Sequence, residues 1–176
     1  AVEATEIHRT WLSSDSLAAP FHPDSMKENN LIPKYRFWNR YSENYLLGDV
    51  ARYDPSTGGF PTSRPEGFAD DEGLDNKLYP FKYKTAEQPI LNETDQLIAL
   101  DTKIYFETAD PDLATTAGLV NMGYVGDEAY RWVITDTFQL LNHQISPASE
   151  ALRCSDCHGG TARMDLKGQL GYQLKG

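Results

Sequence analysis

The pentapeptide Cys154-Ser155-Asp156-Cys157-His158 contains the only two cysteines of the chain, and it constrains the fold more than any other feature. In a C-x-x-C-H motif the two thiols can add across the two vinyl groups of one porphyrin. The histidine that follows is then held under the iron as its axial ligand. We therefore predict one covalent haem c, attached through Cys154 and Cys157 and ligated by His158.

Other uses of a cysteine pair fit this chain less well. A structural zinc site needs four protein ligands, usually two such pairs, and the chain has no second cysteine pair. A thioredoxin-like redox pair requires a βαβ context, which a histidine after the second cysteine does not indicate. We favour haem over a redox or chance C-x-x-C pair.

The length and charge of the chain limit its class. With 176 residues it can bury a core, and we expect a single monohaem domain over 1–176. The formal charge of −10 excludes non-specific nucleic-acid binding, which depends on Lys and Arg neutralising phosphates. The same charge favours solubility or a basic redox partner.

The sequence also bears on the compartment. No run of about 18 apolar residues is present, so we expect no membrane span. The first residues, Ala1-Val2-Glu3, lack the basic and apolar regions of a signal peptide. Because haem is attached to C-x-x-C-H motifs outside the cytoplasm, we expect a periplasmic or extracellular protein, either in mature form or as a piece of a larger exported polypeptide.

Turn-forming residues divide the chain into two regions. Prolines and glycines interrupt residues 1–92, which also contain many aromatic residues, so we predict an ordered, loop-rich wrapping region with a few short strands or helices. Residues 93–176 carry helical patterns and the haem motif. The fold class predicted is therefore mainly α around one covalent haem, with a long irregular, loop-rich N-terminal half.

Four helices are predicted in the second region. Asn92 can cap a helix that runs to about Phe106. Asp110-Pro111 is a cap followed by a proline at the first helical position, with Gly123 as the stop. A helix over 127–143 is predicted from apolar residues at steps of four and three. Ser146-Pro147 repeats the cap-and-proline pattern and predicts a short helix that delivers Cys154.

The sixth iron position determines the function, and His143 is the first candidate for it. It lies eleven residues before Cys154, at the end of a predicted helix, from which it can fold back over the porphyrin. A histidine there can also simply cap the helix. Other candidates, at lower odds, are His8, His22 and Met122, or an open position, while Met164 lies close after His158 and Met26 is uncommitted.

Several blocks of the chain resemble multihaem c-type cytochromes of the octahaem tetrathionate reductase type. His143-Gln144-Ile145-Ser146-Pro147 and Ala151-Leu152 precede the haem motif as in the last haem module of that family. The blocks in matching order are Trp38-Asn39-Arg40, Ser42-Glu43, Tyr45 to Asp49, Leu78 to Lys82, Met164-Asp165-Leu166 and Leu170-Gly171-Tyr172.

The resemblance implies that His143 is a haem axial ligand, of this haem or of a neighbouring one. It also implies a fold like the C-terminal part of a multihaem reductase. This chain departs from the family in having one haem motif, and Lys84 stands where the family pattern has a histidine. Multi-electron reduction therefore does not carry over to this chain.

Taken together, we expect one-electron transfer through a low-potential, bis-histidine haem rather than catalysis, because bis-histidine ligation implies a lower potential than His/Met. The expected partner is a redox protein, either another cytochrome or a second copy, within an oligomer or complex. Two alternatives stay open: a subunit or fragment of a multihaem reductase of the tetrathionate or nitrogen-oxide type, and a gas-binding or sensor module with an open sixth position.

Overall fold

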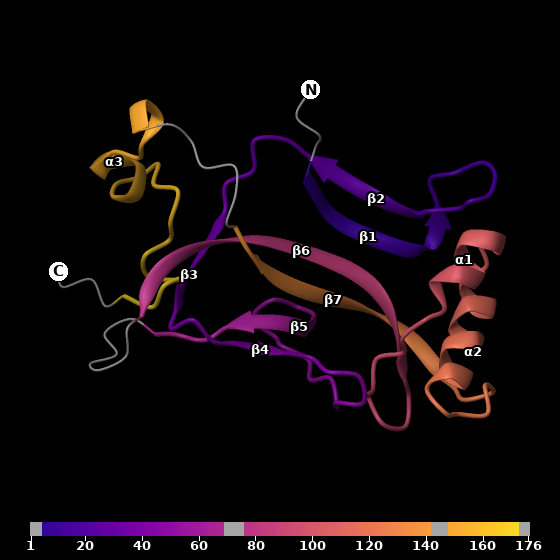
Figure 1. Ribbon diagram of the computed structural model, residues 1–176. Coiled ribbons are helices and arrows are strands. Elements are labelled where there is room, and N and C mark those ends of the chain that lie inside the picture. The colour runs from indigo at the N-terminus through magenta and orange to yellow at the C-terminus, as the bar shows by residue number, and fades with distance from the viewer. Residues whose placement is uncertain (1–4, 69–75, 142–147, 173–176) are drawn as a thin grey trace. The chain divides into compact units, whose positions relative to one another are not determined.

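Strands dominate the molecule (Figure 1). The computed structural model describes residues 5–68, 76–141 and 148–172. The strands are β1 (Thr5–Ser14), β2 (Pro23–Glu28), β3 (Lys34–Trp38), β4 (Ser42–Asn44), β5 (Phe60–Pro65), β6 (Lys77–Leu91) and β7 (Tyr130–Leu140). The helices are α1 (Thr102–Thr108), α2 (Pro111–Asn121) and α3 (Cys154–Cys157), with the 3-10 turn η1 (Ala148–Glu150).

Seven strands form one sheet in the order β2-β1-β6-β7-β5-β4, and β3 also pairs with β6. The prediction of a mainly α fold with an irregular N-terminal half is therefore wrong. Six of the seven strands lie before residue 92, in the region expected to be loop-rich. Pro23 stands at the start of β2, but Pro61 and Pro65 lie in β5, and Pro80 and Pro89 lie in β6. The prolines of this region therefore did not exclude strands.

The helix predicted over 127–143 is instead the strand β7. A step of four residues fits a helix, but it also keeps Tyr130, Ile134 and Phe138 on one side of a strand, because four is a multiple of two. This segment is rich in β-branched residues, with Val133 and Thr135 beside Ile134, and such residues favour a strand over a helix.

Two other helices were predicted with different success. Instead of a helix from Asn92, the chain forms the β-bridge Ile90–Leu97, and α1 begins at Thr102, capped by Asp101. The prediction for the next helix is confirmed: Asp110 caps α2, whose first residue is Pro111. Short polar caps thus located a helix more reliably than apolar periodicity did.

The chain forms two compact units, each assembled from three segments. Unit 1 comprises Ala1–Asn29, Asn44–Thr62 and Lys84–Thr137. It contains β1, β2, α1 and α2, and within it α1 and α2 lie side by side (Figure 1). Three apolar clusters form its core, and their buried members are Trp11, Tyr105 and Ala114; Ala51, Ile90 and Leu97; and Leu91, Ile98 and Leu119.

Unit 2 comprises Asn30–Glu43, Ser63–Tyr83 and Phe138–Gly176, and it contains the C-x-x-C-H motif. Strand β3 pairs antiparallel with β6, so that Tyr35 faces Pro80 and Arg36 faces Tyr79. Ring contacts join the aromatic side chains of this unit, with Phe81 fully buried among them. None of the helices in the described residues is long and apolar enough to cross a membrane.

Candidate haem-binding site

A single turn of helix, α3, carries both cysteines. Because Cys154 and Cys157 are three residues apart in a helix, their side chains lie on the same face. The backbone N–H of His158 donates a hydrogen bond to the Cys154 carbonyl oxygen at 2.8 Å. His158 then turns to an extended backbone conformation (φ −125°, ψ 130°), which ends the helix directly after the second cysteine.

Local hydrogen bonds on both sides fix the position of this turn. One Asp156 carboxylate oxygen accepts from the Arg153 N–H at 2.7 Å, which ties the helix start to its third residue. The Arg163 N–H donates to the Asp156 carbonyl oxygen at 2.7 Å. Gly159 has a φ of +122°, which glycine adopts without steric cost and which turns the chain away after the motif.

The donor set of α3 fits a covalently attached haem. Both thiols are free, with Cys154 exposed and Cys157 partly buried. The His158 side chain is exposed, and among the described residues its imidazole has no hydrogen bond or ion pair. Two reactive sulfurs on one helical face and an available imidazole immediately after them are the groups needed for two thioether bonds and one axial ligand.

Strand β3 lies beside the motif. Tyr35 is close enough to Cys157 and Arg163 to interact with both electrostatically. Burial raises the pKa of the Tyr35 phenol, charge on Cys157 raises it further, and the Arg163 guanidinium opposes both. Nothing in the sequence predicted this neighbour, because 122 residues separate Tyr35 from Cys157 and no local pattern connects them.

The segment after the motif is anchored by apolar side chains. Met164 is 8% exposed and Leu170 is 4% exposed. The Tyr172 ring lies against Phe37 of β3, with ring centroids 5.6 Å apart. Because Met164 is buried, its thioether is occupied in packing within unit 2.

The candidates for the second axial ligand differ in their surroundings and in whether their side chains already have contacts. His143 lies outside the described residues. In unit 1, His8 Nδ1 is 2.8 Å from Thr85 Oγ1, and the His22 ring packs on Phe106. The Met122 sulfur accepts a hydrogen bond from the Ala99 N–H at 3.4 Å, whereas Met26 is 61% exposed on β2.

Lys84 stands where the pattern of the multihaem cytochromes has a histidine, and in this chain it forms an ion pair. Its ammonium nitrogen lies 3.2 Å from Glu6 Oε1, and Arg9 contacts the other oxygen of the same carboxylate at 3.0 Å. Burial raises the pKa of Glu6, but hydrogen bonds and charge from Arg9 and Lys84 outweigh burial and lower it overall. Position 84 thus contributes to the packing of unit 1.

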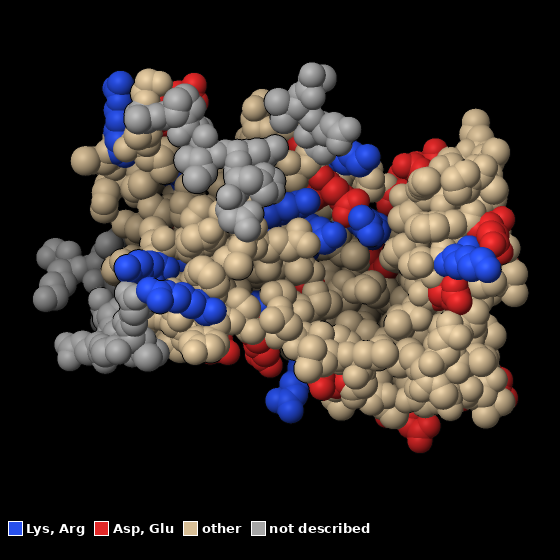
Figure 2. All heavy atoms as spheres, viewed as in Figure 1, with Lys and Arg blue, Asp and Glu red and all other residues tan. Residues whose placement is uncertain are grey.

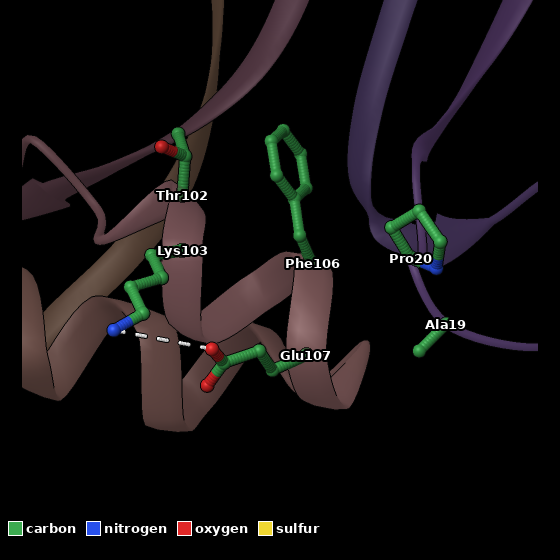
Figure 3. A pocket seen from close by; sticks show the side chains of 6 residues that line it. All are labelled: Ala19, Pro20, Thr102, Lys103, Phe106 and Glu107. Carbon is green, nitrogen blue, oxygen red and sulfur yellow. Dashed lines mark ion pairs between the residues drawn. The ribbon is translucent and has the colours of Figure 1, made fainter.

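A groove of about 600 Å³ lies between α1 and the loop before β2, in unit 1. Figure 3 shows Phe106 and Pro20 on its walls and the exposed pair Lys103–Glu107, 4.0 Å apart, at its side. Neither a cysteine nor a histidine lines it. This groove therefore supplies none of the cysteine or histidine groups that a covalent haem needs.

Comparison with known proteins decides the family. The family described as "Cytochrome c bacterial" matches residues 24–161, which is more than half of the chain and includes the whole C-x-x-C-H motif. The chain belongs to the bacterial cytochrome c family. The prediction of a c-type cytochrome with covalent haem is thereby confirmed. No curated protein matches the sequence.

A solved structure supports the fold of this cytochrome. The octaheme cytochrome c from Shewanella oneidensis is similar to it with a TM-score of 0.73 and 24% sequence identity. The match covers 99% of this chain and 43% of that chain. The resemblance to multihaem cytochromes is therefore confirmed, and the chain spans less than half the length of that protein.

Proposed function

We propose that this cytochrome is an exported monohaem electron carrier with a low-potential haem ligated by His158 and His143. The observation that carries the proposal is α3, which presents two free thiols on one face and an exposed imidazole directly after them. When bound there, the haem supplies an iron centre that accepts and releases one electron.

The protein groups have separate tasks in this proposal. Cys154 and Cys157 hold the porphyrin, so that the cofactor cannot dissociate when its charge changes. His158 ligates the iron from a position fixed by its backbone hydrogen bond to Cys154. Gly159 and Gly160 have no atoms within 4 Å of where a Cβ would stand, which supports an open approach for a redox partner.

Haem stoichiometry and spectroscopy test the proposal. Purified holoprotein should contain one haem per chain, with a low-spin six-coordinate spectrum in both redox states. Replacing His143 by Ala should abolish the low-spin six-coordinate spectrum and raise the reduction potential. His22→Ala, which removes an imidazole from unit 1, should change neither the spectrum nor the potential. A methionine charge-transfer band, or an unchanged spectrum in H143A, would exclude His143.

The partner is proposed to be a redox protein, either another cytochrome or a second copy of this chain, because one-electron transfer needs a neighbouring centre.

The length comparison supports a second candidate function, in which the chain is part of a multihaem oxidoreductase, since the chain matches 43% of an octaheme chain. Native mass together with the haem-to-protein ratio separates the two: a tightly associated subunit with further haems would reject the lone carrier. An open, gas-binding site would instead bind CO in the reduced protein.

A further inference from the structure

One face of β3 lies against the haem motif and the chain that follows it. Successive side chains of a strand alternate between its two faces, so Tyr35 and Phe37 share a face. The Phe37 ring packs against Tyr172, with ring centroids 5.6 Å apart, where the chain after α3 returns to β3 (Figure 1). Tyr35 interacts with Cys157 in α3 itself. Two separate contacts thus place this face of β3 beside the cysteine that anchors the haem.

Arg163 is held at the same place. Its backbone N–H donates a hydrogen bond of 2.7 Å to the carbonyl oxygen of Asp156, the residue before Cys157. Met164, the next residue, is 8% exposed and packs within unit 2, so packing as well as this hydrogen bond holds the backbone. The Arg163 guanidinium is close enough to the Tyr35 phenol to act on it electrostatically. The cation of Arg163 therefore stays beside Tyr35 and Cys157.

The place of this cation gives it an effect on electron transfer. When Cys157 is joined to the porphyrin by a thioether bond, groups beside its sulfur lie beside the edge of the haem. The oxidised haem carries one more positive charge than the reduced haem. A nearby cation repels the additional charge and so favours the reduced form, which raises the reduction potential.

Tyr35 determines how strongly that cation acts. Its side chain is half-buried, and burial raises the pKa of the phenol, so the ring lies where water is partly excluded. Charges interact more strongly in such surroundings than in water. A neutral ring at this position therefore reduces the screening between Arg163 and the edge of the haem.

We propose that Arg163 and Tyr35 form a contact that tunes the haem at its Cys157 edge: the Arg163 cation raises the reduction potential, and the Tyr35 ring shields this interaction from water. The inference rests on the proposed electron-transfer function, for which it names two residues that set the potential. Neither residue ligates the iron. Their effect opposes that of a second histidine ligand, which lowers the potential relative to a methionine.

Potentiometric titration of the purified holoprotein tests the role of Arg163. Arg163→Gln should shift the reduction potential downwards, and the shift should shrink between about 10 mM and about 1 M salt, because the screening length falls from about 30 Å to about 3 Å. Arg163→Lys keeps the charge and should retain most of the wild-type potential. Lys167→Gln removes an equal charge from an exposed position of the same segment, in the turn after Asp165, and should shift the potential much less.

Variants of Tyr35 test the shielding. Tyr35→Ser admits water to the edge of the haem, so Arg163→Gln should cause a smaller shift in this background than in wild type. Tyr35→Leu keeps an apolar cover and should leave that shift at its wild-type size, and it serves where Tyr35→Ser fails to fold. Tyr41→Ser, at a 71% exposed position of unit 2, should not alter the shift either.

The outcomes distinguish this contact from the proposed function. Wild-type protein whose haem is not reversibly reduced by one electron rejects the proposed function and the contact together. A reversible haem whose potential is the same in R163Q as in wild type, or that shifts equally in R163Q and K167Q, overturns the contact alone. A shift from R163Q that is equal in wild type and in the Y35S background, or that Y35L abolishes, rejects the shielding by Tyr35.

Discussion

The two units of the cytochrome are stabilised in different ways. The three apolar clusters all lie in unit 1, where α1 and α2 also have side-chain caps. In unit 2, the residues from Glu150 to Cys154 are exposed, as are His158, Gly159 and Gly160. A covalent haem attached to α3 would cover exposed groups of unit 2. We infer that unit 1 folds on its own apolar core, while the haem completes the core of unit 2.

Charge separates the units as well. Unit 1 contains 17 acidic and six basic residues, and unit 2 contains nine acidic and ten basic residues. Acidic side chains accordingly lie over the region of α1 and α2 (Figure 2). Unit 1, which lacks the haem motif, therefore carries a formal charge of −11, and unit 2 carries +1. The charge of the whole chain is thus no argument for a basic partner at the haem.

Removal of the haem should produce the largest effect and should be confined to unit 2. Replacing Cys154 and Cys157 by serine should abolish covalent haem, seen as loss of haem staining after denaturing electrophoresis. Amide exchange should then become fast throughout the segment from α3 to Leu170, which loses its cofactor contacts, while α2 stays protected. Ser155→Ala, an exposed change inside the motif, should leave both haem and protection intact. Equal loss of protection in α2 would break the distinction between the units.

A cavity in unit 1 should have the converse effect. Leu119 is fully buried in α2, so Leu119→Ala should lower the free energy of unfolding by about 2–5 kcal/mol, as for other buried leucines. Chemical denaturation followed by far-UV circular dichroism measures the loss, and the haem absorbance should not change. Leu113→Ala, in the same helix but 53% exposed, should cost about 0.5 kcal/mol or less. A changed haem spectrum in L119A would contradict independent cores.

The same contrast explains what the sequence could predict. The C-x-x-C-H motif and the pair Asp110-Pro111 can be interpreted from the sequence because the groups involved are close together in the chain. The α2 cap at Asp110 formed as expected. The family followed from the motif together with blocks in matching order. The strands depend on partners far away in the chain, as β3 does on β6, and no local rule encodes such pairings. A step of four residues is ambiguous between helix and strand, which is why β7 was mistaken for a helix.

Loss of the α2 cap should have a smaller effect within unit 1. Asp110 Oδ1 accepts hydrogen bonds from the Asp112 N–H at 2.9 Å and the Leu113 N–H at 3.0 Å. Asp110→Ala should therefore lower the free energy of unfolding by about 1 kcal/mol, measured by the same denaturation. Asp110→Asn keeps an acceptor oxygen and should cost only a few tenths. If both variants lose equal stability, the carboxylate acts by charge and not as a cap.

High pH should provide the mildest test of unit 1. Tyr130 of β7 donates a 2.5 Å hydrogen bond to Asp112 Oδ1 of α2, and burial together with this carboxylate raises the pKa of the phenol to about 12. Because the folded pKa exceeds the unfolded value of about 10, the stabilisation is complete below pH 10 and is lost as the pH rises towards 12. Stability should fall with pH in this window in wild type, and less in Tyr130→Phe, which has no proton to lose. Tyr41→Phe, at a 71% exposed position of unit 2, should keep the wild-type slope. Haem absorbance that stayed constant while stability fell would assign this pH dependence to unit 1, whereas parallel changes would show that the α2–β7 contact also supports the haem-binding unit.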